Sequence, residues 1–168
     1  SAISAVRALQ TMGLKVQLMS GDTDLATAEM ADRLGGVARA ASVSPEQKIS
    51  TVEALQADGA RVLMVGDGLN DAAALAAATS SMSPASALDV ARTAADIVIL
   101  GGDLESIPAA IRMARTTRRL VKQNFAIAAG YNLLAVPIAI AGLATPLLAA
   151  IAMSTSSITV LINAMRAR

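Results

Sequence analysis

The feature that most constrains this chain of 168 residues is a run of 43 residues, 123–165, without a charged side chain. A bilayer core is about 30 Å thick, and a helix needs about 20 apolar residues to cross it. The run fits two such helices, which we expect over 125–144 and 146–165, with a turn near Thr145-Pro146. The alternative is a buried helical hairpin in a water-soluble core, but soluble helices rarely run this long without a charged face.

Positive charge flanks the run on both sides: Arg112, Arg115, Arg118, Arg119 and Lys122 precede it, and Arg166 and Arg168 follow it. Because cytoplasmic flanks are rich in Lys and Arg, both ends are expected in the cytoplasm. This predicts a multi-pass protein of the inner (cell) membrane with a cytoplasmic soluble part. Residues 1–105 have a net charge of −6 and residues 106–168 a net charge of +7, which indicates two environments.

Composition excludes several chemistries. The chain has no cysteine and no histidine, so disulfide scaffolds, thiolate zinc sites and Ser-His-Asp catalysis are impossible within it. One Tyr, one Phe and no Trp leave no platform for stacking bases, so we expect no nucleic-acid partner. The chain starts with Ser1 and goes directly into an apolar pattern without a signal peptide, which favours a processed or cut piece of a longer protein.

Residues 1–111 alternate strand-like and helix-like patterns. The strand-like segments are 15–19, 61–65 and 96–100, and the helix-like ones are 1–12, 23–34, 45–57 and 85–94. Ser44 precedes Pro at the first and Gln at the third helical position, a typical helix start. Such alternation predicts an α/β fold with a parallel sheet and helices on both faces. A further helix is expected over 106–120. It joins the α/β part, 1–111, to the membrane part, 112–168.

Polar residues follow two of the predicted strands. Ser20-Gly21-Asp22 follows the first, the six-residue run GDGLND (66–71) follows the second, and Lys48 lies near the start of a helix between them. Ligands of open parallel sheets bind at the carboxyl ends of the strands. We therefore expect Ser20, Lys48, Asp67 and Asp71 to converge at one edge of the sheet.

This set of residues suits a magnesium ion and a phosphoryl group. Mg²⁺ binds through one or two carboxylates and phosphate oxygens, and Gly66 and Gly68 allow close backbone approach. A lysine supplies positive charge for a transferring phosphoryl group. Taken singly, each motif has an ordinary structural alternative: an Asx turn for GDGLND, a helix cap for Asp22 and a solvated lysine for Lys48.

The segments SGD, SPEQK and MVGDGLNDAAAL resemble motifs of the haloacid-dehalogenase superfamily as found in P-type ATPases. KQNFAIAAGYN and AMSTSSITVLINAMR resemble the last two membrane helices of heavy-metal (P1B) pumps. SMSPASALDVARTAADIVIL and ATPLLAAIAMS resemble copper(I) pumps, especially the subgroup serving cytochrome-oxidase assembly. The resemblance covers essentially the whole chain and implies a partial haloacid-dehalogenase-like (Rossmann-like) domain followed by a transmembrane hairpin.

The resemblance also implies roles for single residues. Asp67 would bind catalytic Mg²⁺, with Asp71 and Asn70 positioning phosphate and metal. Lys48 would neutralise the phosphoryl group, Ser20-Gly21 would hold its oxygens, and Asp22 would shape the site. In the hairpin, the path of the transported Cu⁺ would include Tyr131, Asn132, Met153 and Ser157. Met153 and Ser157 share a helix face, and a thioether suits Cu(I), although helix packing is the ordinary role of such residues.

The chain also departs from the family pattern. It has no DKTGT motif, no CPC cysteine pair, and no counterpart of the nucleotide-binding and actuator domains. The resemblance thus implies a carboxyl-terminal piece of a cation-translocating pump whose other domains, ATP and lipid bilayer are its partners, together with a copper chaperone. We expect no ATPase activity from the chain alone. Two alternatives stay open: a membrane-anchored phosphatase of the same superfamily and a non-catalytic membrane module that binds metal or a partner.

Overall fold

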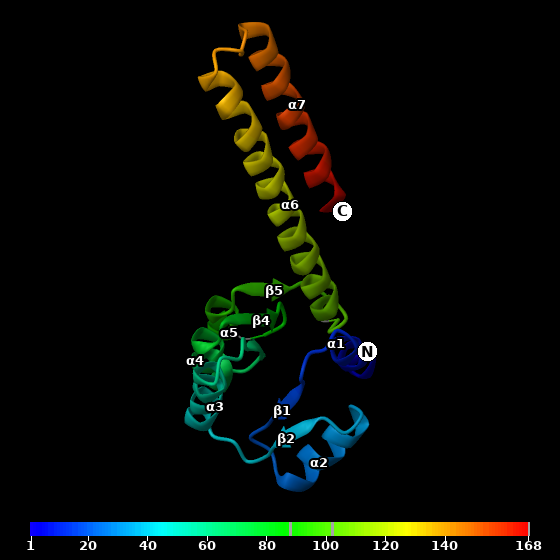
Figure 1. The fold of residues 1–168 in the computed structure, drawn as a ribbon. Coiled ribbons are helices and arrows are strands. Elements are labelled where there is room, and N and C mark those ends of the chain that lie inside the picture. The colour runs from blue at the N-terminus through cyan, green and yellow to red at the C-terminus, as the bar shows by residue number, and fades with distance from the viewer. Residues whose placement is uncertain (88, 102, 168) are drawn as a thin grey trace. The chain divides into compact units, whose positions relative to one another are not determined.

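The computed structural model describes residues 1–87, 89–101 and 103–167. Two compact units are distinguished, Ser1–Pro108 and Ala109–Arg168. The order of elements along the chain is shown in Figure 1.

The first unit contains five short strands that alternate with helices along the chain. The helices are α1 (Ala2–Thr11), α2 (Asp24–Arg33), α3 (Pro45–Ala57), the 3-10 turn η1 (Leu69–Asp71), α4 (Ala72–Ala77) and α5 (Asp89–Ala94). The strands are β1 (Gln17–Met19), β2 (Ala38–Ala40), β3 (Leu63–Val65), β4 (Ser80–Pro84) and β5 (Ile97–Ile99). All observed strand pairs are parallel, which confirms the predicted α/β class.

The strands form two sheets rather than the single sheet that the sequence predicts. β1 pairs with β2, and the second sheet has the order β3-β4-β5. Gln17 lies opposite Ala38 in the first sheet, and Leu63 opposite Ser80 in the second. The separation leaves β1 and β3, the two strands that precede the polar motifs, each with one unpaired edge.

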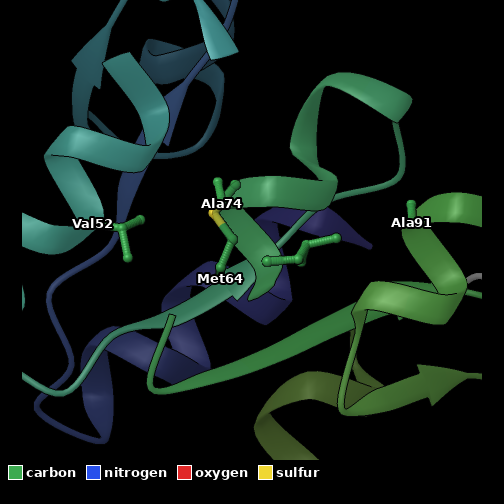
Figure 2. Packing of buried hydrophobic residues seen from close by; sticks show 5 residues of the cluster. Val52, Met64, Ala74 and Ala91 are labelled. Carbon is green, nitrogen blue, oxygen red and sulfur yellow. The ribbon is translucent and has the colours of Figure 1, made fainter. Parts of the chain in front are cut away.

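Two hydrophobic clusters hold this unit together. Figure 2 shows Val52, Met64, Ala74 and Ala91 of the larger cluster, which come from α3, β3, α4 and α5. The smaller cluster comprises Val6, Ala31 and Val37.

β1 contributes to both clusters. Met19 packs against the larger cluster and Leu18 against the smaller one. Successive side chains of a strand point to opposite faces, so this short strand joins the two clusters.

The predicted element bounds need several corrections. The helix expected over 85–94 begins at Asp89, after a turn in which the Ala87 N–H donates to the Pro84 carbonyl; residue 88 lies outside the described part. β2, α4 and β4 were not predicted. Their sequences ARA, AAALAA and SSMSP carry no strand-like apolar run or helical amphipathic pattern that would reveal them.

The second unit contains two long helices. α6 (Ser106–Ile140) continues without a break through the helix predicted over 106–120 and ends four residues before the predicted end of the first span at 144. Gly142, at a φ of 74°, adopts a left-handed conformation just after this end, where a glycine is favoured. α7 (Pro146–Ala164) begins with Thr145 as its cap, close to the predicted turn, and is followed by the 3-10 turn η2 (Met165–Ala167).

Both long helices have the length and composition of membrane spans. Their apolar windows have mean hydropathies of 1.3 and 1.7, and few of their side chains are buried. A surface of this kind in water would be a large exposed apolar patch, which soluble proteins avoid.

Candidate functional site

The α3 helix begins as its sequence predicts. The Ser44 side chain accepts a hydrogen bond from the Gln47 N–H at 3.2 Å, and the Gln47 side chain accepts one from the Ser44 N–H at 2.8 Å. This reciprocal capping box stabilises the first turn of α3 and sets the position of Lys48.

Lys48 and Asp71 form the centre of the candidate site. The Lys48 ammonium donates to Asp71 Oδ1 at 2.6 Å, and the two side chains are only 11% and 13% exposed. A lysine this deeply buried needs a charged partner, because an unpaired ammonium would lose most of its hydration. The predicted solvated-lysine alternative is therefore wrong.

The turn after β3 closes tightly over Asp71. The Gly68 N–H donates to Asp71 Oδ2 at 3.4 Å. A Cβ atom added at Gly66 would lie 2.7 Å from the Asp71 Cβ and 2.9 Å from Oδ2, closer than atoms pack. Gly66 is thus required by the close contact with Asp71. A Cβ atom added at Gly68 would lie 3.5 Å from Asp71 Oδ2, which is an ordinary contact distance.

Asp67 and Asn70 lie on the same turn, but both are exposed. In the described part of the chain, the Asp67 carboxylate forms no ion pair. Mg²⁺ accepts one or two carboxylates and keeps several waters, so the exposed Asp67 carboxylate fits such an ion. Among the described residues there is no cluster of three or more acidic side chains, so a complete site would need further ligands from water, phosphate or other chain segments.

Ser20, Gly21 and Asp22 form a second, self-contained group. The Ser20 hydroxyl donates to Asp22 Oδ2 at 2.8 Å and accepts from the Asp22 N–H at 3.1 Å. The cap of α2 is Thr23, whose side chain accepts from the Ala26 N–H, so the alternative of Asp22 as the helix cap is wrong.

Both groups adjoin the start of α3. The Val43 N–H donates to the Ser20 carbonyl at 2.9 Å, two residues before the helix begins, and Lys48 lies in its first turns. Among the described residues no hydrogen bond or ion pair joins Ser20–Asp22 directly to Lys48–Asp71. The structure therefore brings Lys48, Asp71 and the two glycines into contact and holds Ser20 beside the same helix start, while convergence of all four predicted groups stays a prediction.

In the hairpin, the residues predicted for a metal path lie on different faces. Tyr131 lines a pocket of about 310 Å³ between α6 and α7 together with Ser156, whereas Asn132, Met153 and Ser157 are exposed. Met153 is 66% exposed and is not among the residues that line this pocket. A metal path through Met153 and Ser157 would thus need groups from outside the hairpin.

The sequence analysis missed a polar contact between the two long helices. The Asn163 side-chain amide donates to the Asn124 Oδ1 at 2.8 Å. The signal that could have identified it is the presence of two amides, at positions 124 and 163, within the uncharged run.

Comparison with known proteins finds proteins that this chain resembles. A sequence profile for haloacid dehalogenase-like hydrolases matches residues 1–79. The nitrogen fixation protein FixI of Rhizobium leguminosarum bv. viciae is 52% identical over 98% of this chain, and a copper-exporting P-type ATPase of Bacillus subtilis is 45% identical over 96%. The chain spans only 22% and 20% of the length of these two relatives.

Solved structures of ATPases also resemble this chain. A zinc-transporting PIB-type ATPase in the E2.Pi state matches 98% of this chain with a TM-score of 0.92 and 32% identity, and the match covers 27% of that chain. The catalytic domain of the CPx-ATPase CopB-B matches 65% of this chain with a TM-score of 0.60 and 34% identity. The soluble and helical parts therefore both have counterparts in one class of pump.

Proposed function

We propose that the chain is one segment of a P1B-type ATPase and that it serves ATP-driven export of a heavy-metal cation, Cu(I). In the whole pump, ATP phosphorylates an aspartate outside residues 1–168, and this chain supplies part of the pocket around the phosphoryl group. The observation that carries the proposal is the buried Lys48–Asp71 pair beside the Gly66–Gly68 turn.

Lys48 and Asp71 have distinct tasks in this proposal. Phosphoryl transfer spreads negative charge over the equatorial oxygens, and a positioned cation stabilises it. Asp71 holds the Lys48 ammonium in one place, since the pair is nearly buried. The positive charge is therefore oriented before the phosphoryl group arrives, which is how preorganised electrostatics lowers a barrier.

Asp67 is the proposed ligand of the magnesium ion. The ion, when bound, neutralises charge on the phosphoryl oxygens. Asp67 is exposed next to the paired Asp71, so its carboxylate is available where Asp71 is not. Asn70 and the Ser20-Gly21-Asp22 group complete the proposed pocket through amide, hydroxyl and backbone N–H groups.

Cu(I) as the transported cation is supported by two observations. A relative that matches 96% of this chain is named a copper exporter, and the hairpin offers thioether and hydroxyl groups without an acid or a histidine. Soft ligands such as Met favour Cu(I) over harder cations. The solved pump with the same fold is named for zinc, so the metal needs a direct test.

The experiment uses the pump that contains this segment, reconstituted in liposomes. Formation of the phosphoenzyme from radiolabelled ATP is measured in the wild type, in Asp67→Asn and in Asp103→Asn, an exposed acid outside the proposed pocket. We expect the rate of phosphoenzyme formation to fall at least a hundredfold in Asp67→Asn and to be unchanged in the control. Equal rates of phosphoenzyme formation in all three proteins would contradict the proposed role of Asp67.

The metal is tested in the same liposomes. Cu(I) is expected to stimulate ATP hydrolysis and Zn(II) is not; stimulation by Zn(II) alone would overturn the copper assignment. The isolated chain is expected to have no ATPase activity. Mg²⁺-dependent turnover by the chain that Asp67→Ala abolishes would instead favour a membrane-anchored phosphatase.

A further inference from the structure

The amino-terminal half of α6 carries a one-sided basic surface. Five cations lie within eleven residues, and all of them are exposed. At 3.6 residues per turn they fall within an arc of about 120° around the helix axis. We call this surface the basic face of α6; its members are Arg112, Arg115, Arg118, Arg119 and Lys122.

The basic face is shaped as well as charged. Arg115, Arg118, Arg119 and Lys122 line an open concavity of about 500 Å³, together with Gln123 and Ala126. No acidic residue follows Glu105 in the sequence, and residues 106–168 have a net charge of +7.

The depth of these cations favours a lipid ligand. A span of about 30 Å takes about 20 helical residues, which reach back from the end of α6 at Ile140 to Val121. Arg118, Arg119 and Lys122 then lie within about one turn of the hydrocarbon boundary. Long basic side chains at this level place their charged ends among the head groups while their stems stay in apolar surroundings.

We propose that the basic face of α6 binds the phosphate head groups of anionic phospholipids in the leaflet at the amino-terminal end of the α6 span. Clusters of four or more Lys and Arg next to a membrane helix attract anionic lipid through its negative surface potential. Arg118, Arg119 and Lys122 contact head groups directly. Arg112 and Arg115 lie farther out and act through longer-range attraction, which salt screens.

This inference rests on the membrane insertion contained in the proposed function, but not on ATP, magnesium or the transported metal. The test reconstitutes the full chain in phosphatidylcholine vesicles and compares spin-labelled phosphatidylglycerol with spin-labelled phosphatidylcholine. Electron paramagnetic resonance measures the motionally restricted fraction of each label at the protein surface. We expect the anionic label to associate more strongly, by a factor on the order of five.

A charge-matched pair of variants locates the effect. The triple variant Arg118→Gln, Arg119→Gln, Lys122→Gln should bring the two labels close to equal association. The control variant loses three exposed cations of the first unit, through Arg7→Gln, Arg33→Gln and Arg61→Gln, and should keep the wild-type preference. Retention of the preference in the triple variant, or its equal loss in the control, would overturn the proposal.

Three further outcomes would assign the basic face to a different ligand or contradict membrane insertion. Excess inorganic phosphate at constant ionic strength should leave the lipid preference in place; its loss would assign the basic face to a free anion and overturn the proposal. Restricted but equal association of both labels would contradict the lipid inference alone and point to an acidic protein segment. Absence of a restricted fraction for both labels would contradict membrane insertion itself.

Discussion

The first unit places a charged pair inside itself, whereas the second unit has its charges in the amino-terminal half of α6 and after α7. Lys48 and Asp71 are nearly buried and satisfy each other at 2.6 Å. The hairpin instead buries little, and its described inter-helix side-chain contact is between two neutral amides, Asn124 and Asn163. The difference follows from the solvent: water allows a buried ion pair where the fold supplies the partner, but hydrocarbon strongly disfavours charge.

The largest predicted effect comes from breaking the ion pair of the first unit. Lys48→Ala leaves the Asp71 carboxylate nearly buried without its cation, and we expect a loss of about 3 kcal/mol in the free energy of unfolding. Chemical unfolding in detergent, followed by circular dichroism, measures it. Replacing both partners, as Lys48→Met with Asp71→Leu, should recover most of the loss. A cost for Lys48→Ala no greater than that for the exposed Lys15→Ala would contradict the comparison.

The next effect comes from the turn that closes over the pair. Gly66→Ala places a Cβ 2.7 Å from the Asp71 Cβ, so the turn or the carboxylate must shift. We expect a loss of about 1–3 kcal/mol in the same unfolding measurement. Gly68→Ala is the matched control, because its Cβ would keep an ordinary distance of 3.5 Å from Asp71 Oδ2. Equal losses for the two variants would show that close contact with Asp71 is not the cause.

A smaller effect is expected at the start of α3, which positions Lys48. Ser44→Ala removes the cap and should lower stability by about 1 kcal/mol. Ser44→Asp keeps a capping oxygen and should retain most of that stability. The unfolding midpoints of the two variants decide this; equal midpoints would argue against a capping role for the side chain.

The same serine controls the titration of a neighbouring carboxyl. The hydrogen bond donated by the Ser44 hydroxyl at 2.7 Å is the main reason that the pKa of Glu46 is lowered from 4.5. A lowered folded-state pKa contributes stability above pH 4.5 that is lost as the pH falls through the folded-state value. Ser44→Ala should raise the pKa of Glu46 toward 4.5, as measured by NMR titration; an unchanged pKa would contradict this assignment.

The smallest effect concerns the hairpin. Asn163→Ala leaves the Asn124 amide without this partner and should destabilise the hairpin by about 0.6 kcal/mol. Reversible unfolding in bicelles measures the change, and Asn132→Ala, at an exposed position, is the control. A loss as large as that of Lys48→Ala would remove the contrast between the two units.

Several elements were predictable from local patterns. The bounds of α3 agree with the prediction at both ends, and its start was predictable because Ser44, Pro45 and Gln47 form a complete start signal. α7 also begins where Thr145-Pro146 indicates. In contrast, β4 consists of three serines, Met82 and Pro84, and it becomes a strand because β3 and β5 pair with it on either side.

Polar contacts in β4 show why such a strand has no local signature. Ser81 is buried, and its N–H and hydroxyl both donate to Asp96 Oδ2, at 2.9 and 3.3 Å. Asp96 lies 15 residues away along the chain. The serine is thus acceptable in the interior because of a distant partner that no window of sequence contains.

Sequence alone determined the division into an acidic α/β part and a basic helical part with a long uncharged run, because periodicity and charge are local properties of the chain. It also identified Lys48, Gly66 and Asp71 as residues worth examining together. Only the tertiary structure decided that Lys48 is paired with Asp71 rather than solvated, that the strands form two sheets and that Asn163 meets Asn124. These facts depend on contacts between residues far apart in the chain, whose free energies exist only once the intervening segments have folded.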